Sequence, residues 1–160
     1  MTQKPDCVFC RIARGEVQVH IVCETDDLVV FCDRNPIRRG HLQILPRMHI
    51  ETFDLLPEAL ANAILAMGQS LARVQKRLYG VERVAFLFTG GDVNHAHAHL
   101  VPMHDKTDIT STRYIATPDL TFADPPFASD ATLRDTATEL SEALSAAMSD
   151  AVIGQDRVPS

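Results

Sequence analysis

Three histidines occupy every second position between residues 95 and 101, and small or apolar residues separate them. They are His95, His97 and His99 in the sequence HAHAHLV. Successive side chains of a β-strand point to opposite faces, so this spacing predicts one row of imidazoles about 7 Å apart. Imidazoles titrate near neutral pH and bind metals. The row is therefore a poor packing surface, and it favours a site for a metal ion or a phosphate.

A second motif lies near the N-terminus, where Cys7 and Cys10 form a Cys-x-x-Cys pair. This spacing supplies one half of a tetrahedral zinc site, which needs two further ligands. The alternatives to a zinc site are a redox pair or two buried thiols. Cys23 and Cys32 lie in strand-like runs; they can complete the zinc site, but we interpret them as buried free thiols.

The elements that must position these motifs follow an α+β pattern. The predicted strands cover residues 17–24, 28–33, 41–46 and 83–88, and the histidine row adds a fifth. A short helical turn is predicted over 7–14 and a helix over 129–148. A long helix is predicted between Pro57 and Gly80, because apolar residues recur there at spacings of three and four. This order favours a five-stranded antiparallel sheet covered by one long helix and a C-terminal helix.

Length and composition exclude several classes of protein. The chain has 160 residues, of which 46% are hydrophobic and 22% charged, as expected for a globular domain with a core. The net charge of −6 argues against a broad surface for a nucleic-acid polymer or an acidic membrane. No apolar run approaches the roughly 20 residues of a membrane helix, and residues 1–6 are too short and polar for a signal peptide. We expect a cytoplasmic protein.

Several motifs in order resemble the signature of the histidine triad (HIT) family. They are CVFCRI from Cys7, VFCD ending at Asp33, GHLQILPRMH ending at His49, and the row of three histidines. Together they cover well over half of the chain. The resemblance implies a five-stranded antiparallel sheet in each subunit of a homodimer, and hydrolysis or transfer at the α-phosphorus of a purine nucleotide derivative. The Hint-like branch of nucleoside phosphoramidases is favoured over the Fhit-like branch of dinucleoside polyphosphate hydrolases.

The resemblance also implies roles for individual residues. His97 is expected to attack the α-phosphorus and to form a transient nucleotidyl-histidine that water then opens. His99 is expected to hydrogen-bond the phosphate oxygens or the leaving group, and His41 to orient the triad. The expected substrate-binding residues are Phe31 at the base, Asp33 at the ribose hydroxyls, and Gly91 and Asp92 near the phosphate.

The turn before the triad departs from the family pattern. Many members carry an Asn and a Gln there, and residues 88–91 replace them in this chain. Asp92 stands where Hint-like members carry a small polar residue such as Ser, and a carboxylate facing a phosphate is repulsive. Met103 follows Val-Pro where an Arg is common, which removes one cation. We therefore expect the turn at residues 90–92 to govern the choice of substrate.

The resemblance completes a structural zinc site. Members with the N-terminal cysteine pair bind zinc through four residues that correspond here to Cys7, Cys10, His49 and His95. His95 would then brace the strand through the metal, while the other two triad histidines face the phosphate. The resemblance further assigns residues 1–104 to the HIT domain. Residues 105–160 are expected to form a C-terminal extension whose helix packs on the same domain.

Two other functions are compatible with these motifs. In the first, all three triad histidines bind one catalytic zinc ion in a hydrolase, as three imidazoles can. In the second, the altered turn leaves a nucleotide-binding regulatory protein with little turnover. Hydrolysis of an AMP-linked amide, and its response to a chelator, separates these functions from a histidine-nucleophile hydrolase.

Overall fold

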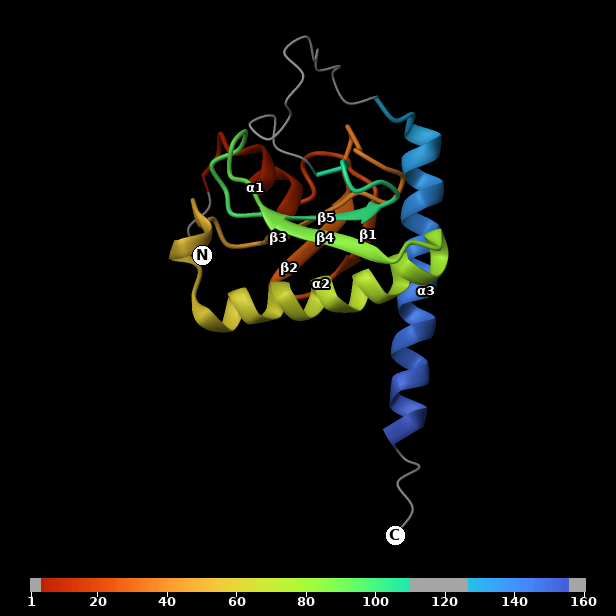
Figure 1. Cartoon of the computed structure of the whole chain (residues 1–160). Coiled ribbons are helices and arrows are strands. Elements are labelled where there is room, and N and C mark those ends of the chain that lie inside the picture. Colours follow the sequence, from red (N-terminus) through yellow and green to blue (C-terminus); the bar gives the residue numbers. More distant parts are fainter. Residues whose placement is uncertain (1–3, 110–126, 156–160) are drawn as a thin grey trace.

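The computed structural model describes residues 4–109 and 127–155, and the side chains of the last helix up to residue 149 (Figure 1). Its elements are α1 (Val8–Ala13), β1 (Ile21–Glu24), β2 (Leu28–Cys32), β3 (Leu42–Pro46), the 3-10 helix η1 (Phe53–Leu55), α2 (Glu58–Tyr79), β4 (Arg83–Phe88), β5 (Ala98–Met103) and α3 (Asp130–Gln155). The strands form one antiparallel sheet in the order β1-β2-β3-β5-β4. The predicted five-stranded α+β fold is thus confirmed.

The long helix α2 begins and ends as its sequence predicts. Pro57 precedes it with the fixed backbone of a helix start, and Gly80 ends it in the left-handed conformation at φ 62°. Its buried residues Ile64, Leu71 and Val74 lie on one stripe, which packs against β3, β4 and β5. The stripe buries apolar surface on one face of the sheet, and this burial stabilises both elements.

Helices cover the two faces of the sheet unequally. On one face, Val30, Ile44 and Leu100 share a core with α2 and with Leu140 of α3. On the other face, the alternate residues of β2 and β3 pack against the short helix α1 and against Val17, Val19 and Val93, in a smaller cluster that includes Phe31. Figure 1 shows α2 beneath the sheet and α1 above it. The short helix leaves part of its face uncovered, and the candidate site lies there.

The prediction of a single histidine strand is wrong for its first half. β5 begins at Ala98, so His99 lies in the strand and the other two histidines precede it. The cause is the loss of pairing: β3 and β5 are in register only where Leu42 to Ile44 face Ala98 to Leu100. Before that point the amide of Ala96 donates to the carbonyl of Ile50 (2.6 Å). His95 and His97 therefore precede the paired part of the strand, although the rings of His97 and His99 remain neighbours.

Two other boundaries differ from the prediction. The run at 17–24 is a strand only over Ile21–Glu24, and a register shift between Ile21 and Cys23 interrupts the pairing of this strand with β2. The C-terminal helix is longer than predicted and packs against α2, β1 and β2. None of the helices within residues 4–109 and 127–155 combines the length and apolar character needed to cross a bilayer.

Candidate active site and metal cluster

A cavity of about 590 Å³ lies on the sheet face that α1 covers only in part. Apolar side chains, among them Phe9, Ile12 and Phe31, line one side of it. Its polar lining includes five of the residues predicted to act on the substrate, namely Asp33, His41, Asp92, His97 and His99. The structure brings these together from distant parts of the chain. Gly91, by contrast, is exposed and does not line the cavity.

His97 is buried in this cavity and its tautomer is fixed. Its Nδ1 lies 2.6 Å from the carbonyl oxygen of His95, which can only accept, so Nδ1 carries the hydrogen. The Phe9 ring lies 4.8 Å from the imidazole, between centroids, and holds its plane. Nε2 of His97 therefore keeps a free lone pair, the property that a nitrogen nucleophile requires.

Two further imidazoles lie beside His97. The His99 ring is 4.9 Å from that of His97, between centroids, and Nε2 of His41 is 3.0 Å from Nδ1 of His99. Burial lowers the pKa of His41, and it lowers the pKa of His99 to about 4. Both rings are consequently neutral near pH 7, and they act as hydrogen-bonding groups rather than as cations.

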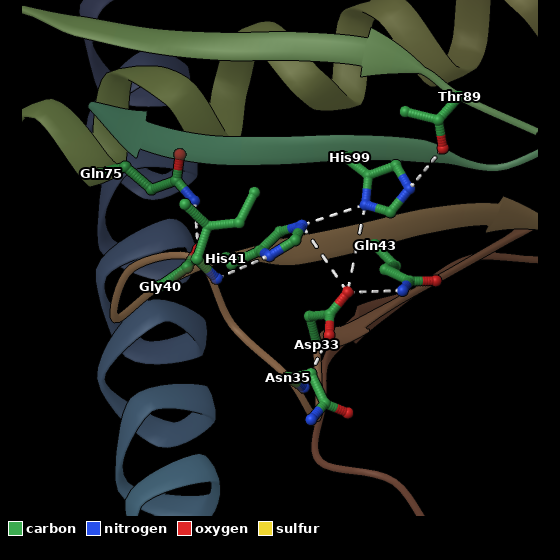
Figure 2. A network of polar contacts seen from close by, with 9 residues as sticks. Asp33, Asn35, Gly40, His41, Gln43, Gln75, Thr89 and His99 are labelled. Carbon is green, nitrogen blue, oxygen red and sulfur yellow. Dashed lines mark hydrogen bonds and ion pairs between the residues drawn. The ribbon is translucent and has the colours of Figure 1, made fainter. Parts of the chain in front are cut away.

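Asp33 lies at the end of β2, where its carboxylate faces the imidazoles. One oxygen accepts the amide of Asn35 (2.8 Å) and so fixes the following turn, while the other accepts Nε2 of Gln43 (2.6 Å) (Figure 2). The second oxygen is 3.6 Å from Nε2 of His41. The carboxylate thus stabilises the turn after β2 and also places acceptor oxygens at the cavity.

The loop that carries His41 is anchored to the core by α2. Nε2 of Gln75, a fully buried residue of α2, donates to the carbonyl of Gly40 (2.7 Å). Gly40 has φ 90°, and a Cβ atom there would overlap the ring of Tyr79. The close approach of loop and helix therefore requires glycine, and it sets the position of the next residue, His41.

A separate cluster contains two cysteines and two histidines, and their candidate ligand atoms lie within 4.8 Å of one another. Its members are Cys7, Cys10, His49 and His95. Sγ of Cys10 is 3.3 Å from Nδ1 of His49 and 3.6 Å from Nδ1 of His95, and Sγ of Cys7 is 3.5 Å from the latter. Zinc bound tetrahedrally at ordinary bond lengths separates sulfur from nitrogen by about 3.6 Å. The donor set and its spacing fit a closed zinc site.

Contacts around this cluster prepare its imidazoles and thiols for a metal. Nε2 of His95 donates to the carbonyl of Pro46 (2.9 Å), which leaves the lone pair on Nδ1 toward the cysteines. Burial lowers the pKa of His95 to about 4 and raises that of the Cys10 thiol. The neutral imidazole is the ligand form, whereas the thiolate form needs the charge of a bound cation.

Three polar residues at the site were not predicted from the sequence. Gln43 stands among apolar residues of β3, and a polar residue within a buried strand is the signal that marks it. Thr89, whose Oγ1 lies 3.2 Å from Nε2 of His99, is an exposed residue in a turn and gives no such signal. Gln75 interrupts the apolar positions of α2, and its burial becomes evident only in three dimensions.

Known proteins resemble the chain in sequence and in fold. The HIT domain matches residues 14–106. An uncharacterized HIT-like protein of Methanocaldococcus jannaschii is 33% identical over 104 residues, 62% of this chain and 80% of that protein. An adenosine 5'-monophosphoramidase of Saccharomyces cerevisiae is 28% identical over 101 residues, 62% of this chain and 64% of that enzyme. A zinc-bound histidine triad family protein of Mycobacterium smegmatis shares the fold, with a TM-score of 0.71 at 22% identity, over 91% of this chain and 97% of that one.

Proposed function

The chain belongs to the HIT domain family, and from this premise we propose that it is a nucleotide hydrolase with His97 as its nucleophile. It would cleave at the α-phosphorus of a purine nucleoside phosphoramidate or of a dinucleoside polyphosphate. The observation that carries the proposal is the tautomer of His97, whose Nδ1–H donates to a main-chain carbonyl and leaves Nε2 free in the cavity. The similarity to a yeast phosphoramidase supports the same chemistry.

In the proposed reaction, the Nε2 lone pair of His97 forms a bond to the α-phosphorus, and the bond to the leaving group breaks. The leaving atom keeps the electron pair and takes up a proton from the surrounding water. A water molecule then attacks the same phosphorus and releases a proton to the solvent. The P–N bond breaks, and its electron pair returns to Nε2 of His97. The neutral His99 donates a hydrogen bond to the phosphate oxygens, where negative charge accumulates. Asp33 accepts from the ribose hydroxyls, and Phe31 lines the base pocket.

A structural zinc ion is part of this proposal. Cys7, Cys10, His49 and His95 would hold it, with four protein ligands and no open position. The metal would supply a cross-link between α1 and two loops, and it would take no part in the cleavage. His95 also offers the carbonyl that accepts from His97, so one residue connects the cluster to the nucleophile.

Hydrolysis of an AMP-linked amide by the purified protein tests the proposal. We expect the His97→Ala variant to lose activity by roughly 10³-fold or more, because the covalent route is removed. Acid-quenched protein should gain the mass of one AMP group in wild type but not in the variant. His104→Ala, which changes an exposed histidine, is the matched control. Wild-type turnover by His97→Ala, or tight AMP binding without turnover of any nucleotide, would overturn the proposal.

We also infer a homodimer, in keeping with the resemblance to the family. β4 lies at an edge of the sheet. The exposed Phe53 of η1 lies beside it, with its ring 4.8 Å from that of Phe88 between centroids, and Leu65 of α2 is also exposed. An edge strand flanked by exposed apolar residues favours pairing with a second copy. Sedimentation equilibrium is expected to give twice the mass of one chain, and a single-chain mass at micromolar concentration would contradict the inference.

A further inference from the structure

A series of hydrogen bonds runs through His41 and His99, and it begins at a main-chain amide. Because an amide can only donate, this first bond determines which atom donates in each of the others. The amide of Ile37 lies 3.3 Å from Nδ1 of His41. An amide N–H can only donate, so Nδ1 of His41 must accept. A neutral imidazole carries one hydrogen, and the hydrogen of His41 is therefore on Nε2. Figure 2 shows His41 between the glycine loop and the ring of His99.

The same reasoning assigns the tautomer of His99. Nε2 of His41 carries the hydrogen and lies 3.0 Å from Nδ1 of His99, so Nδ1 of His99 accepts. The hydrogen of His99 is then on Nε2, which lies 3.2 Å from Oγ1 of Thr89 (Figure 2). The lowered pKa of both imidazoles agrees with neutral rings near pH 7. Each bond in the series admits one direction, from the Ile37 amide to the Thr89 hydroxyl.

A metal site is the other arrangement that the same residues allow. One atom each of Asp33, His41 and His99 lies within 4.8 Å of the others, which suits a bound cation. A cation on Nε2 of His41 needs the lone pair of that nitrogen. Nδ1 of the same ring already accepts the Ile37 amide, so the neutral ring has no lone pair on Nε2. The geometry therefore favours the hydrogen-bond series over a metal.

We propose that Thr89 is a positioning residue for His99 in the hydrolysis proposed above, on which this inference rests. Before substrate binds, its hydroxyl accepts the Nε2 hydrogen of His99 and so orients the imidazole. When substrate binds, a phosphate oxygen would take the place of the hydroxyl as the acceptor of that hydrogen. Thr89 is exposed, directly after β4, in the turn where this chain departs from the pattern of the family. A hydroxyl that accepts one bond keeps its own hydrogen, which stays available to the substrate.

Kinetics of three variants test the role of the hydroxyl. Thr89→Val keeps the shape and removes the hydroxyl, and we expect its kcat on an AMP-linked amide to fall by roughly five- to tenfold, with KM nearly unchanged. Thr89→Ser restores the hydroxyl and most of the rate. Thr138→Val, which changes an exposed threonine of α3, leaves the rate unchanged. In a His99→Asn background, Thr89→Val should have no further effect, because Thr89 acts through His99.

Nitrogen NMR of histidine-labelled protein gives a readout that does not depend on turnover. In wild type, Nε2 of His99 is expected to show the shift of a protonated nitrogen and Nδ1 that of an unprotonated one. In Thr89→Val the hydrogen should stay on Nε2, because His41 still donates to Nδ1, but the Nε2 shift should change as that nitrogen loses its hydrogen-bond acceptor. A wild-type hydrogen on Nδ1 of His99 would overturn the inference, as would a Thr89→Val variant with unchanged kcat and shifts. If wild type hydrolyses no nucleotide while the shifts behave as expected, the proposed function fails and the hydrogen-bond assignment holds.

Discussion

At the scale of single residues, the exposed carboxylate of Asp92 bears on which leaving group the cavity accepts. Asp92 lines the cavity together with His97 and His99. A negative charge there repels the further phosphates of a dinucleoside polyphosphate, whereas it attracts a cationic amine and does not repel a neutral one. We therefore expect the residue to favour amide substrates over polyphosphates.

Asp92→Asn should raise kcat/KM on a dinucleoside polyphosphate relative to an AMP-linked amide by roughly three- to tenfold at low salt, and less at high salt. The ratio of the two kcat/KM values, measured at two ionic strengths, checks this expectation. Asp135→Asn, which removes an equally exposed charge from α3, serves as the control. An unchanged ratio in Asp92→Asn would show that the carboxylate faces away from the leaving group.

The buried His99 makes the stability of the fold depend on pH. Its pKa is about 4 in the folded chain against an ordinary value of 6.5, so the unfolded chain binds the proton first as pH falls. The stabilising contribution of the neutral ring is complete above about pH 6.5, and it is lost progressively as pH falls toward 4.

Urea unfolding of wild type and of His99→Asn between pH 7.5 and 4.5 checks this consequence. The free energy of unfolding should fall more steeply in wild type, with a difference between the two proteins of up to about 3 kcal/mol over the range. Parallel curves for the two proteins would mean that His99 titrates near its ordinary pKa in the folded chain.

At the scale of elements, α2 supports the site as well as the core. The buried side chain of Gln75 holds the Gly40 carbonyl, and this contact positions the loop that carries His41. Replacing Gln75 with Leu leaves a buried carbonyl without its donor. We expect Gln75→Leu to lower the free energy of unfolding by about 1–3 kcal/mol and to reduce kcat as His41 shifts.

Gln69→Leu, an exposed position on the same helix, is the matched control for both measurements. Equal stability and equal kcat for the two variants would show that α2 does not support the site through Gln75. A stability loss in Gln75→Leu without any loss of kcat would limit the role of Gln75 to the core.

The elements also show how far the sequence can predict this protein. The sequence predicted α2 and β4 correctly because proline, glycine and the spacing of apolar residues determine local backbone structure within a few residues. The start of the histidine strand was mispredicted because an alternating pattern does not reveal where strand pairing ends, and the pairing of β3 with β5 reaches only to Ala98. Gln75 was missed because its partner, Gly40, lies far away in the sequence. Thr89 was missed because its contact with His99 depends on the path of the turn between them, which the sequence pattern does not reveal.

At the scale of the whole molecule, the cysteine–histidine cluster joins three segments that are distant in the chain. α1, the loop at His49 and the segment at His95 meet there. If zinc binds as proposed, purified protein should contain one zinc ion per chain. Chelation should then lower the thermal midpoint by several degrees, because a cross-link between distant segments is lost.

Metal analysis of variants separates a structural zinc ion from a catalytic one. Cys10→Ser should lose zinc, whereas Cys23→Ser, outside the cluster, should keep it. His97→Ala should also retain zinc while losing activity. Loss of zinc from His97→Ala would instead support one metal bound by all three triad histidines.

The C-terminal helix shares the core of the sheet. Leu133, Leu140 and Leu144 of α3 are buried in the same cluster as residues of β2 and β3, and Leu133 also lines the cavity. We propose that residues 105–160 and the preceding part of the chain fold as one unit. The length of α3 does not make it a separate module, because its leucines at 133, 140 and 144 are buried in the core of the sheet.

The order of the strands has a consequence for how the chain acquires its structure. β5 lies between β3 and β4 although it follows both in the sequence. During synthesis, β4 therefore has no sheet neighbour until β5 has emerged, and the pairing that completes the sheet joins segments far apart in the chain. The imidazoles of His97 and His99 enter with that final strand. We expect catalytic competence to arise late in folding, together with closure of the sheet.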